Sequence, residues 1–192
     1  MSHLLESKVS GCELFRGSFL NAYRDTVALA SGVTSTREYV VHPGAVMAVP
    51  LLLDASGTLQ LVLERQFRYP VGQVIIEFPA GKLDPGETSL DCAKRELQEE
   101  TGYRADSWAF ACTTHPVVAY STEHIDIWFA RGLMLGERRL DDGESLDVFT
   151  ATPEQFFSWC RAGTVTDAKT LVAALWLQNL LSGVWTLDWN ST

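Results

Sequence analysis

The clearest chemical pattern in this 192-residue chain is a group of three glutamates, Glu96, Glu99 and Glu100. Their spacing of i, i+3 and i+4 places all three on one face of a helix. Like charges so placed destabilise a bare helix by about 0.2–0.5 kcal/mol per pair, so a cationic partner is expected. Arg95 is one candidate, and a divalent cation such as Mg²⁺, which takes oxygen ligands and shares its shell with substrate phosphates, is the other. An isolated pattern of this kind is more typical of a solvated helix surface, so the neighbouring residues decide between the two interpretations.

The segment before these glutamates fits a cation site better than a plain helix surface. Gly81 allows a close backbone approach, and Asp84-Pro85-Gly86 is turn chemistry. Such a loop would bring Glu87 and the carbonyl of Ala80 toward the acidic face. The helix itself is expected over residues 88–101, with a capping-box-like start and a glycine after its end.

The whole stretch resembles the Nudix box, Gly-x5-Glu-x7-Arg-Glu-aliphatic-x-Glu-Glu-x-Gly-aliphatic. The matching residues are Gly81, Glu87, Arg95, Glu96, Leu97, Glu99, Glu100 and Gly102. Tyr103 departs from the pattern at its last, tolerant position.

This resemblance implies an α/β fold, an α/β/α sandwich around a mixed sheet, that hydrolyses a nucleoside diphosphate linked to another moiety. It also implies a set of groups that would hold Mg²⁺, or Mn²⁺ in its place: the Ala80 carbonyl, Glu96, Glu99 and Glu100. Arg95 would orient a box glutamate and act with Glu99 in catalysis, and Glu87 would brace the loop.

Outside the box, residues from about 17 to 177 are similar to ADP-ribose pyrophosphatases and related nucleotide-sugar hydrolases. Three segments carry this similarity: 65–70, 77–80 and 163–170. It implies that Arg68 contacts the phosphates and Glu77 the nucleoside part, and a planar guanidinium suits a diphosphate. A surface ion pair is the alternative for Arg68.

Downstream of the box, Pro116 and Glu123 resemble a proline and a loop glutamate of the same subfamily. Glu123 is therefore the candidate general base or additional metal ligand, and an exposed loop glutamate is the alternative. His115 and His124 flank this loop, but lone histidines are weak evidence for catalysis.

The N-terminal residues 1–42 are expected to form a β-strand arm, followed by a Nudix hydrolase domain over 43–192. By resemblance, this arm would be exchanged within a homodimer, and a small isolated sheet is in any case marginal in water. Phe19 and Arg37 are candidates to hold the base, since aromatic and guanidinium planes stack on such rings. Both residues are also compatible with simple sheet packing.

Composition limits the remaining possibilities. With 46% hydrophobic residues, the chain can bury one domain, with or without a small appendage. A net charge of −9 repels polyanions, so neither nucleic acid nor a membrane surface is an expected partner. The apolar run 45–53 is too short to span a membrane. The four cysteines form no Cys-x-x-Cys pair and no signal segment is visible, so we expect a cytoplasmic protein with free thiols and no zinc site.

Periodicity and turn residues predict the other elements. Strands are expected at 12–16, 19–29, 38–41, 59–65, 74–78, 108–113, 125–131 and 147–150. The pattern at 59–65 is mostly that of a half-buried strand. One helix should begin after Thr152 and stop at Gly163, and a last helix should cover about 166–181 with Ala174, Leu177 and Leu181 as its core stripe.

The sequence thus predicts a Mg²⁺-dependent enzyme that cleaves ADP-ribose, or a similar nucleoside diphosphate sugar, to AMP and ribose 5-phosphate. A preference for a GDP-sugar or a dinucleotide is the alternative within the same class. A nucleotide-sugar-binding regulator without activity is the alternative from another class, and the intact glutamate set argues against it.

Overall fold

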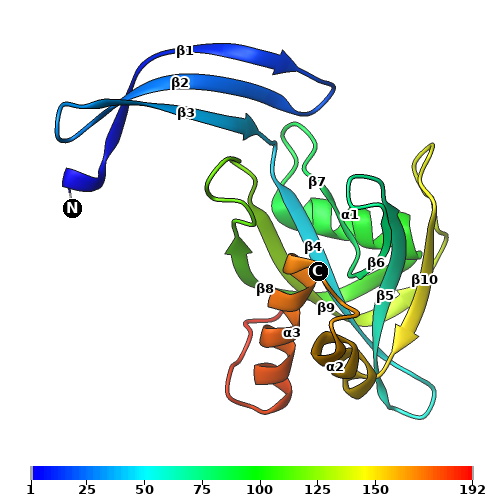
Figure 1. Cartoon of the computed structure of the whole chain (residues 1–192). Helices are drawn as coiled ribbons and strands as arrows, with labels where there is room; N and C mark the ends of the chain where they lie inside the picture. Colours follow the sequence, from blue (N-terminus) through cyan, green and yellow to red (C-terminus); the bar gives the residue numbers. More distant parts are fainter. Residues whose placement is uncertain (1, 192) are drawn as a thin grey trace. The chain divides into compact units, whose positions relative to one another are not determined.

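The structure is a computed structural model that describes residues 2–191. The chain divides into two units (Figure 1). Met1–Gly44 and His115–His124 form the N-terminal unit, and Ala45–Thr114 and Ile125–Thr192 form the larger unit.

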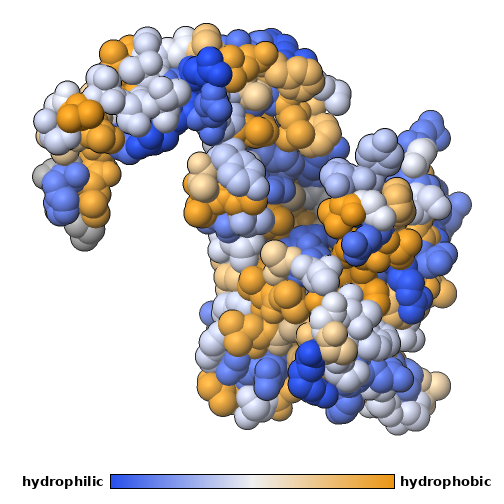
Figure 2. Space-filling model, in the orientation of Figure 1, coloured by the Kyte–Doolittle hydropathy of each residue, from blue (hydrophilic) through white to orange (hydrophobic). Residues whose placement is uncertain are grey.

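The N-terminal unit is built on one antiparallel three-stranded sheet in the order β1-β2-β3. After a short 3-10 helix at Ser2–Leu4, the strands are β1 (Glu6–Arg16), β2 (Asn21–Leu29) and β3 (Thr34–Val41). All three predicted strands are present, but β1 and β3 begin earlier than the aromatic and β-branched residues indicated. Every residue of β1 is exposed, and Figure 2 shows hydrophobic residues on the surface of this unit.

The larger unit contains a mixed eight-stranded sheet whose main path runs β10-β5-β4-β9-β8-β11, with β6 on β5 and β7 on β4. Its strands are β4 (Ala45–Leu53), β5 (Leu59–Arg68), β6 (Gln73–Glu77), β7 (Ala80–Lys82), β8 (Tyr103–Thr114), β9 (Ile125–Leu135), β10 (Leu146–Ala151) and β11 (Asn190–Ser191). β4 and β9 run parallel, and the other pairings are antiparallel.

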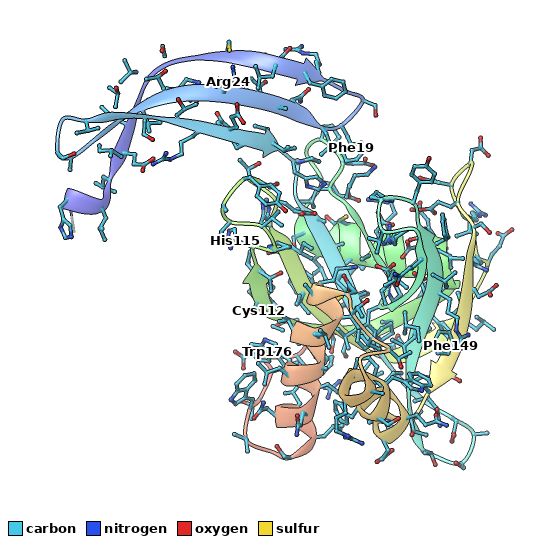
Figure 3. The ribbon with its side chains drawn as sticks, viewed as in Figure 1. Phe19, Arg24, Cys112, His115, Phe149 and Trp176 are labelled. Atoms are coloured by element: carbon cyan, nitrogen blue, oxygen red, sulfur yellow. The ribbon has the colours of Figure 1, made fainter. Side chains whose placement is uncertain are left out.

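Helices cover both faces of this sheet (Figure 1). Alternate residues of β4 enter opposite layers: Met47 packs with α2 (Pro153–Ala162) and α3 (Ala168–Leu181), whereas Val46 packs with α1 (Ser89–Thr101). Figure 3 marks Phe149 and Trp176, which border the α2–α3 layer. This arrangement confirms the predicted α/β/α sandwich with a mixed sheet.

The predicted signals at the ends of α2 are present in full. Thr152 and Gln155 form a complete capping box, and Gly163 ends the helix in the left-handed region. α3 begins at Ala168 with Asp167 as its N-cap, slightly later than predicted.

The predicted core stripe of α3 was wrong at Leu181, whose side chain is half exposed. The buried residues of α3 are instead Thr170, Ala173, Ala174 and Leu177. The buried face includes the polar Thr170 because its hydroxyl accepts a hydrogen bond from the Phe78 amide. Hydrophobicity alone therefore misplaced the buried face of α3.

The half-buried pattern predicted for β5 was also wrong. Leu61, Val62, Leu63 and Glu64 are all buried, because this strand lies inside a sheet that is covered on both faces. In addition, no helix among residues 2–191 has the length and apolar character to span a membrane.

Candidate active site

The short strand β7 and helix α1 position the box residues. β7 pairs with the start of β4, where Ala80 lies opposite Met47. Thr88 caps α1 by accepting a hydrogen bond from the Asp91 amide, and Gly102 ends the helix with a φ of 78° that favours glycine. Strand, loop and helix therefore form one compact support for the glutamates.

Arg95 is the centre of a hydrogen-bond network that joins the loop to α1. Its Nε and Nη2 donate to the two carboxylate oxygens of Glu87, both at 2.9 Å, and its Nη1 donates to Glu96 at 2.7 Å and Glu99 at 3.0 Å. Nη2 also donates to the Lys82 carbonyl at 3.1 Å. The bidentate pair holds the pKa of Glu87 at about 2, so this carboxylate stays charged and keeps the loop on the helix.

The carboxylate of Glu96 packs directly on the backbone of Gly81. A Cβ atom at Gly81 would lie 1.8 Å from Oε1 of Glu96, so any side chain there would displace the carboxylate. Burial raises the pKa of Glu96 to about 7, although Arg95 acts in the opposite direction. The glycine of the box is therefore needed for the close approach predicted from the sequence.

Glu100 is the most buried of the three glutamates on this face, with 3% exposure. Its Oε2 accepts a hydrogen bond of 2.9 Å from the Ala80 amide. Burial raises its pKa strongly, and the neighbouring carboxylates of Glu64 and Glu96 raise it further. Ala80 and Glu100, both predicted metal-holding residues, are thus in direct contact.

Glu64 on β5 was missed by the sequence analysis. It lies opposite Glu77 in the β5–β6 pairing and is only 1% exposed, and its Oε1 has no hydrogen-bond partner among the described residues. Burial and the Glu77 charge raise its pKa. The available signal was an acidic residue inside a strongly apolar strand, but the assumed half-buried strand placed it in solvent.

The donor set of this region fits a hard divalent cation. Carboxylate oxygens are the ligands that Mg²⁺ prefers. Glu64 and Glu100 are buried and Glu96 is half-buried, and protein cations offset the charge of these three carboxylates only in part. Within residues 2–191, however, no three His, Cys, Asp or Glu side chains already surround one metal position. In this arrangement Glu96 and Glu99 are instead hydrogen-bonded to Arg95.

A second charged cluster joins β5, β6 and the start of α3. Arg68 donates from Nε and Nη2 to the two oxygens of Glu77 at 2.7 and 2.8 Å. Lys169 donates to Glu77 Oε2 at 2.5 Å and to Asp167 Oδ2 at 3.1 Å. The structure thus brings the two predicted substrate-binding residues, Arg68 and Glu77, together. Lys169 is a third member of this cluster; it lies in the segment 163–170 but was not predicted as a site residue.

Glu123 belongs to the N-terminal unit. Its Oε1 lies 3.9 Å from Nε2 of His42, and its amide donates to the Ser121 hydroxyl at 3.1 Å. Phe19, labelled in Figure 3, packs edge to face on the His42 ring with ring centroids 5.9 Å apart. Phe19 and Glu123 therefore share His42 as a neighbour.

Arg37 makes its contacts within the N-terminal sheet. Its Nε donates to Glu6 Oε2 at 2.9 Å, and its Nη1 donates to the Ser35 hydroxyl at 2.9 Å. These contacts tie β3 to the residue that begins β1, so Arg37 and Phe19 have different partners in this structure.

Comparison with known proteins assigns the family. The model of the NUDIX domain matches residues 41–174, which include every residue of the box. This chain belongs to the Nudix family. Within it, the chain is a hydrolase similar to ADP-ribose pyrophosphatases, as the predicted resemblance indicated.

Two relatives span almost the whole chain. The ADP-ribose pyrophosphatase of Bacillus subtilis is 35% identical over 180 residues, covering 93% of this chain and 95% of the relative. The methanol dehydrogenase activator of Bacillus methanolicus is 34% identical over 183 residues, covering 93% and 96%. A crystal structure of an ADP compounds hydrolase shares the fold, with a TM-score of 0.82 at 22% identity over 94% of this chain and 96% of that one.

Proposed function

We propose that this enzyme hydrolyses the diphosphate linkage of ADP-ribose, or of a similar nucleoside diphosphate sugar, to AMP and ribose 5-phosphate. The observation that carries the proposal is the joining of the box residues into one network, with Arg95 on Glu87, Glu96 and Glu99. The similarity to an ADP-ribose pyrophosphatase over 93% of the chain supports the choice of substrate.

In this proposal, Mg²⁺, or Mn²⁺ in its place, is held by the Ala80 carbonyl, Glu96, Glu99 and Glu100. Such a cation neutralises charge on the diphosphate and activates the attacking water when it is bound. Arg95 keeps Glu96 and Glu99 together, and the Ala80 amide fixes one oxygen of Glu100. These contacts hold the carboxylates on one side of α1 and β7, although among residues 2–191 they do not already surround one cation position.

The other proposed roles come from the family pattern. Glu123 accepts the proton of the attacking water, Arg68 donates to the diphosphate, and Glu77 contacts the nucleoside part. Phe19 and Arg37 hold the base. Both belong to the N-terminal unit, as does Glu123, so their roles rest on the pattern and on side-chain chemistry.

A substrate panel tests the proposed reaction. Purified protein is incubated at equal Mg²⁺ with ADP-ribose, GDP-mannose, UDP-glucose, a dinucleotide and ATP, and the nucleoside monophosphate formed is measured by chromatography. We expect the highest kcat/KM for ADP-ribose, because groups on both sides of the scissile linkage contribute binding energy to its placement. A preference for ATP would contradict the substrate class, and a preference for GDP-mannose or the dinucleotide would favour the alternative within the class.

We further propose that residues 1–42 act as a dimerising arm and that 43–192 carry the hydrolase. The fully exposed β1 and the three-stranded sheet support this, because pairing with a second copy would cover apolar side chains such as Phe15. Light scattering at micromolar concentration should show a dimer, and a monomer would contradict it. Cytoplasmic location remains a prediction, to be checked by cell fractionation.

A regulatory function is the second candidate, and the similarity to a methanol dehydrogenase activator favours it. In that case the chain would act on a partner enzyme, with or without hydrolysis. Metal-dependent turnover of a nucleotide by the purified chain alone would exclude the non-catalytic form of this candidate.

A further inference from the structure

We propose that Lys169 is a positioning residue for substrate binding: it holds the buried Glu77, and Glu77 in turn orients Arg68 toward the diphosphate. This inference rests on the proposed function and deepens it. Among the described residues, Lys169 pairs with Glu77 and Asp167, and in this scheme it does not contact the substrate itself. It acts through Glu77.

The contacts of Glu77 are the first argument. Its side chain is 2% exposed, and it accepts three charge-assisted hydrogen bonds, two from Arg68 and one from Lys169. Most of the hydrogen-bonding capacity of Glu77 is thus used within the protein. In addition to any direct contact with the nucleoside part, Glu77 therefore influences a ligand through the guanidinium that it holds.

The two cations on Glu77 differ in exposure, which is the second argument. The Lys169 side chain is 10% exposed, whereas that of Arg68 is 40% exposed. Arg68 uses Nε and Nη2 for Glu77, and the two N–H groups of Nη1 take no part in this pairing. The bidentate pair fixes the plane of the guanidinium, so the remaining edge has a defined direction.

The start of α3 holds Lys169 in place. Asp167 caps the helix by accepting from the Thr170 amide at 3.0 Å, and the same oxygen accepts from Lys169 at 3.1 Å. The buried Thr170 hydroxyl also accepts from the Phe78 amide at 3.3 Å, next to Glu77 in the chain. α3 and the end of β6 are thus connected at two adjacent points.

The charges explain why Arg68 needs Lys169. With Arg68 alone, the pair with Glu77 would be neutral, and the carboxylate would offset most of the attraction of Arg68 for a diphosphate. Lys169 shares the charge of Glu77 with Arg68 and also pairs with Asp167, so the four side chains are neutral together. Without Lys169, a net negative charge would remain beside Arg68 and oppose an anionic ligand. Removal of Lys169 would also leave a buried carboxylate with half of its cationic partners, and its hold on Arg68 would become less defined.

A double-mutant cycle on the full-length protein tests this role. Lys169→Met keeps the length of the side chain and removes its charge, Lys169→Arg keeps the charge, and Glu77→Gln removes the carboxylate through which Lys169 is proposed to act. Arg161→Met, which removes an exposed charge at the end of α2, is the control for the change in net charge. For each variant, kcat and KM are measured with ADP-ribose, and thermal unfolding confirms the folded state.

We expect Lys169→Met to raise KM about tenfold, equivalent to about 1.4 kcal/mol of binding, with a much smaller change in kcat. Lys169→Arg should restore most of the affinity, and Arg161→Met should match the parent protein. In the Glu77→Gln background, Lys169→Met should have little further effect, because the carboxylate that links it to Arg68 is gone. An unchanged KM in Lys169→Met, or the same rise in both backgrounds, would overturn the proposal.

Calorimetric binding of inorganic pyrophosphate separates this inference from the proposed function. Pyrophosphate binding should weaken about tenfold in Lys169→Met even if the enzyme prefers another nucleotide to ADP-ribose. If ADP-ribose is not cleaved by the parent protein, the substrate assignment fails, while pyrophosphate binding to the parent protein and to Lys169→Met still reports on Lys169. If the parent protein and Lys169→Met bind pyrophosphate equally, the positioning role fails whatever the substrate is.

Discussion

The pKa of Asp25 in the N-terminal sheet is lowered, whereas the pKa values of Glu96 and Glu100 on the box helix are raised. In the sheet, Asp25 pairs with Lys8 at 2.8 Å and accepts from the Tyr39 hydroxyl at 2.9 Å, and these partners lower its pKa. Around the box, burial dominates and raises the pKa of Glu96 and Glu100. In the sheet, Lys8 offsets the charge of Asp25. Around the box, the glutamates carry more negative charge than Arg95 offsets.

This difference separates structural charges from functional ones. A lowered pKa with a permanent partner indicates a contact that supports the fold. Buried carboxylates with raised pKa values are costly for the fold alone, and they cluster where a ligand or a cation completes the site. The comparison therefore predicts that mutations around the box change activity more than stability, and that mutations in the sheet of the N-terminal unit do the reverse.

The largest expected effect is on the proposed cation site. Removal of divalent cations with a chelator should abolish turnover, and added Mg²⁺ should restore it. Glu100→Gln should lower kcat by about 10²–10³-fold, the range found when one group that stabilises transition-state charge is lost. The variant should stay folded, since a glutamine oxygen still accepts from the Ala80 amide and one buried charge is removed.

Glu154→Gln is the matched control for this experiment, because Glu154 is an exposed acid in the first turn of α2. Its kcat should equal that of the parent protein. A folded Glu100→Gln variant with normal kcat would contradict the assignment of Glu100 to the cation.

The second-largest expected effect is the loss of kcat in Glu123→Gln. If Glu123 is the general base, kcat should fall by at least about 10²-fold, with little change in KM. The carboxylate lies 3.9 Å from His42, a contact too long to make a large contribution to stability, so the melting temperature should change little. An unchanged kcat would return Glu123 to the exposed-loop interpretation.

The sequence predicted the region around the box better than any other part of the site. The spacing of Glu96, Glu99 and Glu100, the cap glycine and the Arg95 partner are all local, since they lie on one helix and the loop before it. Local periodicity and turn chemistry are sufficient to place such residues. The fold class followed from the same motif.

The second cluster was only partly predictable because its contacts are distant in sequence. Lys169 and Glu77 are separated by 92 residues, and the buried position of Glu64 depends on helices covering both faces of the sheet. A pattern of alternating residues contains no information on how many layers cover a strand. Arg37 was likewise assigned from its chemistry, and its contact with Glu6, 31 residues away in the sequence, could not be predicted from local patterns.

A smaller effect is expected from the proposed base-binding residue Phe19. Phe19→Ala should raise KM for ADP-ribose by about 2- to 10-fold, since an aromatic contact contributes about 0.5–1.5 kcal/mol beyond its buried area. The KM for pyrophosphate analogues without a base should not change, and kcat should be nearly constant. Equal losses for ligands with and without a base would indicate that Phe19 supports the fold through its packing on His42 instead.

The smallest expected effect is a pH dependence of the N-terminal sheet. Lys8 on β1 and Tyr39 on β3 hold the pKa of Asp25 below its ordinary value, so the folded state binds its proton less readily than the unfolded state. The resulting stabilisation is fully present above the ordinary aspartate pKa of about 3.9 and is lost as the pH falls through the lower, folded value. The stacked rings of Tyr23 and Tyr39, with centroids 5.8 Å apart, contribute to the near-ultraviolet circular dichroism of the protein, so loss of this sheet changes that signal. From about pH 5 to about pH 2, the Asp25 carboxyl passes from its ionised to its protonated form. Over this range the parent protein should lose the signal more steeply than Asp25→Asn, which lacks the titrating group. Identical titration curves for the two proteins would show that the charge of Asp25 does not stabilise the sheet. The contrast between this structural carboxylate and the carboxylates of Glu96 and Glu100 would then be wrong.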